Sequence, residues 1–430
     1  MTPRRILAAG WLVFLLYAYP GFLQTDGVDQ LVDSRVGEFT DWHSPMMTQL
    51  WRIVGVVISG PAGMLFVQSL LLLGGTYQLL RRAMADRAAA IAAVCVLGFP
   101  PLVATTALIS PEAQLASFLL AGAAALASER LAIRIGGLGL MVVACGMRDG
   151  ASLAALPIIV AVFRWRDEPR WHRLAIATLA WVVVVVAAVG LERLFVDTRT
   201  ERNEVSLAIS DIVGTLHFAN ELDDGELQAL LADTPLASST GIQQRARTLY
   251  GKSALYTTTD QRLFDPPWSA AQREGLIEAR GALARAAPAG YLTHRGARFV
   301  RLLGLPRSRP WSPLHTQFVG DPAQATAIQH SARHSVLQAT LIRPVEWLSQ
   351  TFLFRPYVYF ILALVLLPVA AVRRQRESTL LFASAVGYEL ALMFVSARGD
   401  YRESHWMIAA TVLAIILLIA RGATRPATRP

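Results

Sequence analysis

Two adjacent stretches decide the fold: ILAAGWLVFLLYAYPGFL at residues 6–23 and TDGVDQLVDSRVGEFTDWHSP at residues 25–45. The first is apolar and close to the length of about 20 residues that a helix needs to cross a bilayer. The second carries five carboxylates and a histidine: Asp26, Asp29, Asp33, Glu38, Asp41 and His43. Ionisable groups beside hydrocarbon are costly and usually functional. We therefore expect chemistry at the membrane surface where the first helix ends.

The composition of the whole chain is that of a polytopic membrane protein. Hydrophobic residues make up 54% and charged residues 17%, whereas a soluble domain has about 45–50% and about 25%. The net charge of +9 lies largely in basic clusters that follow every second apolar block. By the positive-inside rule these clusters and both termini are cytoplasmic. The charge therefore encodes orientation, and we expect membrane lipids as partners and no nucleic acid.

Counting apolar blocks predicts an all-α polytopic membrane protein with about ten transmembrane helices. The spans fall near residues 6–23, 60–80, 88–109, 115–127, 131–147, 151–163, 174–191, 352–372, 379–396 and 405–420. They form an N-terminal module (1–191) with an acidic outer loop (24–59) and a C-terminal module (351–430). Pro100 and Pro101 should bend or interrupt the third span.

The region between the two modules, residues 192–350, is polar and predicts a mainly helical extracytoplasmic domain. Helical segments are expected near 204–231 and 272–287, and no β alternation is visible. Residues 291–309 (YLTHRGARFVRLLGLPRSR) mix apolar side chains with five arginines. That composition suits a helix lying on an anionic lipid surface.

Ionisable residues from four outer segments are expected to converge. They come from the acidic loop, from Glu112 between two spans, from the turn at Arg148, and from the last outer loop. The last loop contains Arg398, Tyr401 and Arg402. A carboxylate can act as general base toward an acceptor hydroxyl, and an arginine can bind a phosphate through two N–H groups. Glu389, inside a predicted span, is a further candidate because a buried carboxylate is costly.

A first apolar helix, an acidic outer loop and a D-W-H-x-P element resemble the membrane glycosyltransferases of the GT-C fold, which use polyprenyl-phosphate sugars as donors. The residues that carry this resemblance are Asp26, Gly37, Asp41, Trp42, His43 and Pro45, together with Arg398, Tyr401 and Arg402 near the last helix.

The resemblance implies that Asp26, the aspartate of the first outer loop, is the catalytic base. Asp26 is followed by Gly27 and not by the second acid common in the superfamily, so Asp29 and Asp41 remain rivals. We predict Asp26 and Asp41 as catalytic. We predict substrate binding for His43, Glu112, Arg148, Arg398, Tyr401 and Arg402.

The expected reaction is an inverting transfer of a hexosyl or pentosyl unit from a polyprenyl-phosphate donor to a lipid, polysaccharide or protein acceptor at the outer face of the cytoplasmic membrane. No cofactor is expected; a divalent metal on acidic residues is compatible with the sequence but not required by it. Two alternatives stay open. An oligosaccharide ligase of the O-antigen type would depend on His294 or Arg298 of the polar region. A lipid-linked-sugar transporter would carry charges through the membrane centre.

Overall fold

The computed structural model describes residues 1–37, 39–40, 43–163, 169–197, 202–219, 222–232, 234, 242–250, 269–306, 311–318, 328, 334–397 and 399–423. These residues form helices and connecting turns. Apart from isolated bridges such as the one between Phe22 and Leu108, no β-strand occurs among them. The prediction of an all-α fold is confirmed for this part of the chain.

The chain divides into two compact units. Unit 1 comprises Met1–Thr198, Arg309–Ala391 and Tyr401–Pro430, and unit 2 comprises Arg199–Ser308 and Leu392–Asp400. Unit 2 therefore covers less of the polar region than the predicted domain 192–350, because residues after 308 group with the apolar helices of unit 1.

Unit 1 contains most of the helices. Its N-terminal part has α1 (Pro3–Ala18), α2 (Thr25–Val36), α3 (Pro45–Gly55), α4 (Ala62–Leu80), α5 (Asp86–Leu97), α6 (Pro100–Thr106), α7 (Pro111–Leu126), α8 (Leu131–Cys145), α9 (Ala151–Val162) and α10 (Arg170–Phe195). Its C-terminal part has α17 (Val336–Ser349), η1 (Phe352–Phe354), α18 (Pro356–Val372), α19 (Arg376–Val395), η2 (Tyr401–Ser404) and α20 (His405–Ala423).

Among the described residues, four helices are long and apolar enough to cross a membrane: Ala62–Leu80, Trp171–Phe195, Arg376–Val395 and Tyr401–Arg421. A bent pair, α5 with α6, makes a fifth if it is one span. The prediction of about ten spans is not confirmed. The segments that fall short form helices of 12–17 residues, namely α1, α7, α8, α9 and α18. The chain is a multi-pass membrane protein, and its described part holds four or five helices with the length and composition of full spans.

The predicted bend at Pro100 is confirmed, and it helps to build the site. α5 and α6 meet at an angle of 68°, because Phe99 adopts the extended conformation that a following proline favours. The residues that follow α6 then run beside the residues that follow α1. Phe22 N–H donates to Ala107 O at 2.8 Å and Ile109 N–H donates to Phe22 O at 3.0 Å. This pairing brings the start of α7 next to the start of α2.

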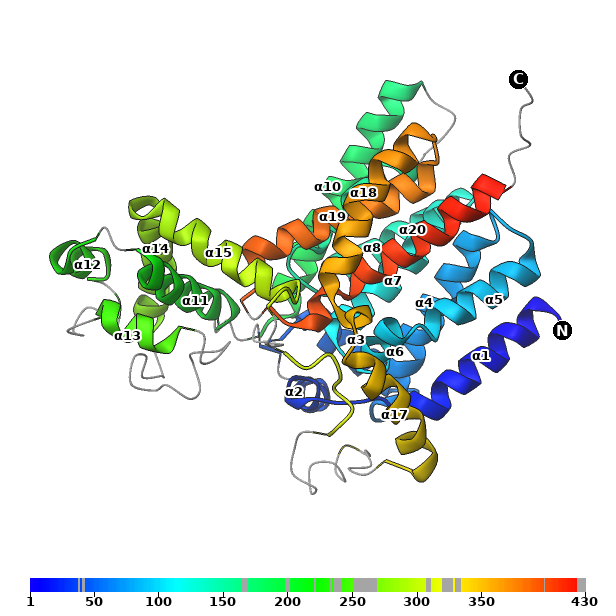
Figure 1. The fold of residues 1–430 in the computed structure, drawn as a ribbon, viewed down its shortest axis with the longest axis horizontal. Helices are drawn as coiled ribbons and strands as arrows, with labels where there is room; N and C mark the ends of the chain where they lie inside the picture. The colour runs from blue at the N-terminus through cyan, green and yellow to red at the C-terminus, as the bar shows by residue number, and fades with distance from the viewer. Residues whose placement is uncertain are drawn as a thin grey trace. The chain divides into compact units, whose positions relative to one another are not determined.

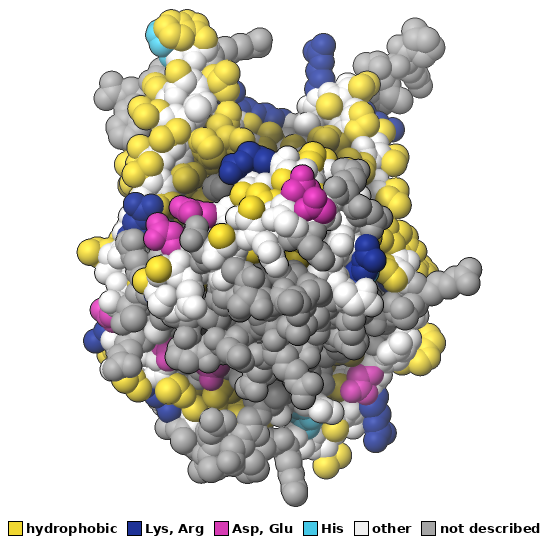
Figure 2. All heavy atoms as spheres, turned by 90° about the vertical axis from the view of Figure 1, so that its left-hand side faces the viewer, with side chains coloured by type: hydrophobic (Ala, Val, Ile, Leu, Met, Phe, Trp, Pro, Cys, Tyr) yellow, Lys and Arg dark blue, Asp and Glu magenta, His cyan; other side chains and the backbone are white. Residues whose placement is uncertain are grey.

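Helices α4, α7 and α8 pack in sequence, and α20 packs against α7 and α18 (Figure 1). Helix α10 leaves much of its apolar surface uncovered, with Leu179, Val183 and Leu194 exposed. In Figure 2, hydrophobic side chains gather mainly in the upper part of the view, and charged side chains lie among and below them. Apolar surface of this extent on a helix suits contact with lipid.

The contact between α4 and α7 depends on Gly75. A Cβ there would lie 2.7 Å from Ala121 N, whereas a Cβ at Gly74 would meet nothing within 4 Å. We expect Gly75→Ala to destabilise the protein by about 1–3 kcal/mol, since the backbones must separate. Gly74→Ala should stabilise it by up to about 1 kcal/mol through helix propensity. Thermal unfolding of both variants in one detergent checks this; equal midpoints would contradict the close packing.

Unit 2 is a bundle around α11 (green in Figure 1). Its helices are α11 (Arg202–Phe218), α12 (Asp224–Leu230), α13 (Ile242–Leu249), α14 (Ala270–Ala286) and α15 (Pro288–Leu302). Val205, Ile209, Ile212 and Leu216 of α11 are buried among residues of the other helices. The predicted helix 204–231 is interrupted after Phe218. A new helix, α12, begins at Asp224, and Asp223 caps it in a capping box with Glu226.

Candidate functional site

The acidic stretch after the first helix is itself helical. Asp26 lies in the first turn of α2, where a carboxylate interacts favourably with the helix dipole. Gly37 ends the helix in the left-handed conformation, with φ of 82°. Asp26 and Asp29 are three residues apart, so both side chains lie on one side of α2.

Arg402 of η2 is the centre of an ionic cluster in unit 1. Its Nη2 donates to Asp26 Oδ2 at 2.9 Å and its Nη1 to Gln24 Oε1 at 3.4 Å. Its Nε lies 3.8 Å from Glu112 Oε1. The Arg402 side chain is only 8% exposed, while that of Asp26 is 32% exposed. Residues from the two ends of the chain thus meet at one guanidinium group.

Glu112 joins Arg402 to a second arginine. Ser110 caps α7 and Pro111 starts it, which places Glu112 in the first turn with its side chain 1% exposed. Arg148 Nη1 donates to Glu112 Oε1 at 2.5 Å, and Arg148 Nη2 donates to Glu403. Burial alone would raise the pKa of the Glu112 carboxyl, but Arg148, Arg402 and hydrogen bonding at the start of α7 together hold that pKa below its usual range. Glu112 is therefore an ionised bridge between the arginines.

A further buried carboxylate lies close to the same segment. Glu389 of α19 is fully buried, and its Oε1 accepts a hydrogen bond of 2.7 Å from Ser404 Oγ. Among the described residues, its Oε2 has no hydrogen-bond partner. Sequence analysis singled out Glu389 because burying a carboxylate in a membrane helix is energetically costly. The structure places Glu389 beside Ser404, the residue that follows Glu403.

Three residues of this cluster were missed by sequence analysis. Gln24 and Glu403 contact Arg402 and Arg148 as described above, and His315 Nδ1 lies 2.5 Å from Gln24 Nε2. Because an arginine only donates, the oxygen of the Gln24 amide must face Arg402 and its nitrogen must face His315. Trp311 of the same loop packs on Tyr401 with ring centroids 5.3 Å apart. Gln24 and Glu403 lie among polar and charged residues at the ends of apolar stretches. That position was the available signal in the sequence, but it does not identify which residues they contact.

The structure brings together four of the predicted residues: Asp26, Glu112, Arg148 and Arg402. Tyr401 is fully buried, with its ring between Trp311 and Phe354. Asp41 and Arg398 lie outside the described residues. The catalytic and binding roles of all of these remain predictions.

His43 is buried beside α2. Its Nε2 lies 3.9 Å from Asp29 Oδ2. Burial and the neighbouring Asp26 raise the pKa of Asp29. Asp29 favours the protonated form of His43 only at a pH at which the Asp29 carboxyl is itself ionised. Its predicted role in substrate binding is untested by this contact.

No group of three His, Cys, Asp or Glu side chains suited to a metal ion occurs within the described part of the chain. We therefore assign no metal ligands. The absence of a required cofactor stays a prediction.

Unit 2 has its own ionic cluster around Asp211, which corrects one prediction. Arg295 and His294 of α15 and Arg280 of α14 contact the Asp211 carboxylate, with Arg280 Nε at 2.6 Å and His294 Nε2 at 3.4 Å. Arg295 is fully buried. Burial lowers the pKa of His294, against the opposing effect of Asp211. The expectation of a helix whose arginines lie on a lipid surface is wrong for this side of α15, because a buried carboxylate on α11 pairs with them.

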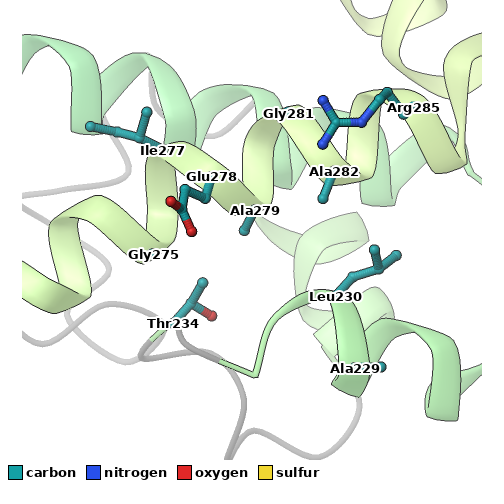
Figure 3. A pocket seen from close by; sticks show the side chains of 10 residues that line it. All are labelled: Ala229, Leu230, Thr234, Gly275, Ile277, Glu278, Ala279, Gly281, Ala282 and Arg285. Atoms are coloured by element: carbon teal, nitrogen blue, oxygen red, sulfur yellow. The ribbon is translucent and has the colours of Figure 1, made fainter.

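A pocket of about 550 Å³ lies in unit 2 between α12 and α14 (Figure 3). Glu278 and Arg285 flank it, and Gly275, Ala279 and Ala282 line the α14 side. None of the predicted site residues lines this pocket.

No protein-family model and no curated protein matches the chain. Among solved structures, it is similar to the crystal structure of ArnT from Cupriavidus metallidurans in the apo state, with 16% identity over 98% of this chain and 77% of that chain. The TM-score is 0.34. At this TM-score the similarity carries no argument about activity, which has to come from the residues.

Proposed function

We propose that this protein is a membrane glycosyltransferase that moves a sugar from a polyprenyl-phosphate donor to an acceptor hydroxyl at the outer face of the cytoplasmic membrane. One observation carries the proposal. Asp26 and Arg402, predicted separately as base and as phosphate-binding cation, lie 2.9 Å apart although 376 positions separate them in the sequence.

The cluster supplies the groups that such a transfer needs. Asp26 takes the proton of the acceptor hydroxyl as general base, and the acceptor oxygen forms a bond to the anomeric carbon of the sugar. The bond from that carbon to the phosphate oxygen breaks, and its electron pair leaves with the lipid phosphate. Arg402 stabilises the charge on the leaving phosphate. A single displacement of this kind inverts the anomeric configuration.

Glu112 and Arg148 have a supporting role in this proposal. Glu112 is buried and accepts from Arg148 at 2.5 Å, and it also faces Arg402 Nε. A guanidinium held by a fixed carboxylate keeps its planar orientation, which two-point recognition of phosphate requires. Arg148 in turn keeps Glu112 ionised.

The membrane setting fits a lipid-linked donor. The ionic cluster lies at the ends of apolar helices, since Arg402 precedes α20 and Glu112 lies in the first turn of α7. Buried charges at such a position are tolerated when they pair with one another or line a substrate path. With both termini cytoplasmic, as the basic clusters indicate, this end of the helices would face the outer side.

The ligase alternative is weaker because of where its residues lie. It requires His294 or Arg298 to act on the substrate, yet His294 is fully buried beside Asp211. Arg298 is 6% exposed and donates to Ser210 Oγ at 3.0 Å. Both side chains support the interior of unit 2, so their loss would act first on folding.

A transfer assay tests the proposal. The full-length chain in liposomes would receive a radiolabelled polyprenyl-phosphate sugar and, separately, a nucleotide sugar, with membrane extract from a strain lacking the gene as acceptor. We expect label in a new product only from the lipid-linked donor, and its loss in Arg402→Ala. Arg421→Ala serves as matched control, because Arg421 pairs with Glu377 in a partly exposed pair.

Mass spectrometry of the product and of the surface glycans of the deletion strain separates the alternatives. An added mass of one sugar supports the transferase, and the addition of a whole oligosaccharide supports the ligase. Unchanged glycans in the deletion strain together with no transfer in liposomes would contradict both enzymes.

A further inference from the structure

All three guanidinium nitrogens of Arg402 face an acceptor of the protein itself. Nη2 donates to Asp26, Nη1 donates to Gln24, and Nε faces Glu112. A phosphate binds a guanidinium through two adjacent N–H groups. Each Nη atom carries two N–H groups, but the Arg402 side chain is only 8% exposed. A phosphate that takes two adjacent N–H groups of Arg402 therefore competes with the acceptors already bound at Nη1 and Nη2.

The three acceptors differ in how easily they can move. Glu112 is 1% exposed and is bound to Arg148 at 2.5 Å, so it is fixed from both sides. Gln24 is uncharged and its contact with Arg402 is long, at 3.4 Å. Asp26 is 32% exposed and lies in the first turn of a helix. The Nη1–Nη2 edge, held by Gln24 and Asp26, is thus the edge that can open.

We propose that the donor phosphate and Asp26 compete for Arg402, so that donor binding itself releases the catalytic carboxylate. The phosphate takes the Nη1–Nη2 edge, and the Asp26 carboxylate turns toward the acceptor. This inference rests on the proposed function, because it takes the donor to be a phosphate-linked lipid and Asp26 to be the base.

The balance of charges in the cluster explains how the exchange would make Asp26 a better base. The cluster holds three carboxylates (Asp26, Glu112 and Glu403) against two guanidinium groups, those of Arg148 and Arg402. While paired with Arg402, Asp26 is a poor proton acceptor, because a nearby cation stabilises the carboxylate. Once phosphate replaces it, Asp26 loses that cation and faces an added anion, and both changes favour taking up a proton. The base is active only when the donor is in place.

The exchange predicts an unusual effect of removing the negative charge. Asp26→Asn should bind a polyprenyl phosphate without sugar about two- to fivefold more tightly than the wild type, the range expected for losing a partly exposed competing ion pair. The test is titration of full-length wild type and variants in nanodiscs with this lipid, followed by native mass spectrometry. Arg402→Ala should lose most of the binding.

Asp29→Asn is the matched control. It removes the same charge from the same helix three residues on, but its ion pair is with His43 and not with Arg402. We expect little change in affinity for Asp29→Asn. Equal tightening in both variants would show a general charge effect and overturn the exchange, as would weaker or unchanged binding by Asp26→Asn. No binding by the wild type would instead overturn the proposed function.

A second measurement needs no variant and covers the case in which Asp26→Asn does not fold. Infrared difference spectra of wild-type protein labelled with ¹³C-aspartate would be recorded before and after adding polyprenyl phosphate. Exchange should shift the carboxylate stretching band of a labelled aspartate as its guanidinium partner is lost. An unchanged band at saturating lipid would overturn the proposal.

Discussion

Asp26→Asn is expected to lower kcat for sugar transfer by about 10²–10⁴-fold, the range that a positioned general base contributes. Asparagine keeps the size of the side chain and can still accept a hydrogen bond from Arg402, which donates to Asp26 at 2.9 Å. It cannot accept the proton of the acceptor hydroxyl at neutral pH. The loss should therefore appear in kcat and not as weaker binding of the donor.

Steady-state kinetics with a polyprenyl-phosphate sugar in detergent or liposomes checks this prediction. Because the same substitution removes the competitor of the donor phosphate, KM for the donor should fall together with kcat. A variant that was inactive because it had unfolded would also fail to bind the donor. Asp29→Asn is the control on the same helix, and a loss of kcat there equal to that of Asp26→Asn would make Asp29 the better candidate for the base.

The sequence predicts which ionisable residues belong to the site because few places in an apolar chain tolerate charge. Glu112 and Arg148 stand at the ends of apolar blocks, and a buried charge there must find a partner. The structure shows that they find each other. That Glu112 and Arg148 belong to the site could be predicted from the free-energy cost of burying a charge. Their pairing could not, because it depends on which helix ends lie side by side.

The partners that were missed lie far away in the sequence. Gln24 contacts His315 across 291 positions and Arg402 across 378 positions. No local sequence pattern indicates such contacts. In the sequence, a buried glutamine or a histidine in a polar loop looks the same as one that is exposed to solvent. The bend at Pro100 was predictable, yet its consequence, the backbone pairing of Phe22 with Ala107 and Ile109, appears only in three dimensions.

Helix length was the weakest part of the fold prediction. Hydropathy records where a chain is apolar, not where its helix ends. The predicted span 6–23 ends at Ala18, because Pro20 cannot donate a backbone hydrogen bond and Gly21 has φ of 116°. In the polar region the Asp223 and Glu226 spacing was a visible capping-box signal for a new helix, and it would have divided the predicted segment 204–231 correctly.

Arg148→Ala is expected to destabilise the protein by about 3–5 kcal/mol, the cost of leaving a buried charge without its partner. Arg148 binds Glu112 and Glu403, and both carboxylate side chains are 1% exposed. Thermal or denaturant unfolding in a fixed detergent measures the loss.

The pH dependence of that loss distinguishes an electrostatic cause from a cavity. In the wild type, arginines hold the pKa of Glu112 below its usual range; without Arg148, burial should raise it. A carboxyl whose pKa is higher in the folded than in the unfolded state binds more protons when folded, so stability falls as pH rises through that pKa. The loss in free energy of unfolding caused by Arg148→Ala should therefore be larger at pH 8 than at pH 5. A deficit that does not depend on pH would indicate lost packing alone.

Arg421→Ala provides the matched comparison, since Arg421 also forms an arginine–glutamate pair, with Glu377 at 2.5 Å. Both of its side chains are 31% exposed, so solvent can screen the charges and the loss should stay below about 1 kcal/mol. If both substitutions cost the same, burial would not be what makes the Arg148 cluster rigid. If only Arg148→Ala is costly, the cluster is a fixed frame, and the movable carboxylate in it is Asp26, whose side chain is 32% exposed while bound to Arg402.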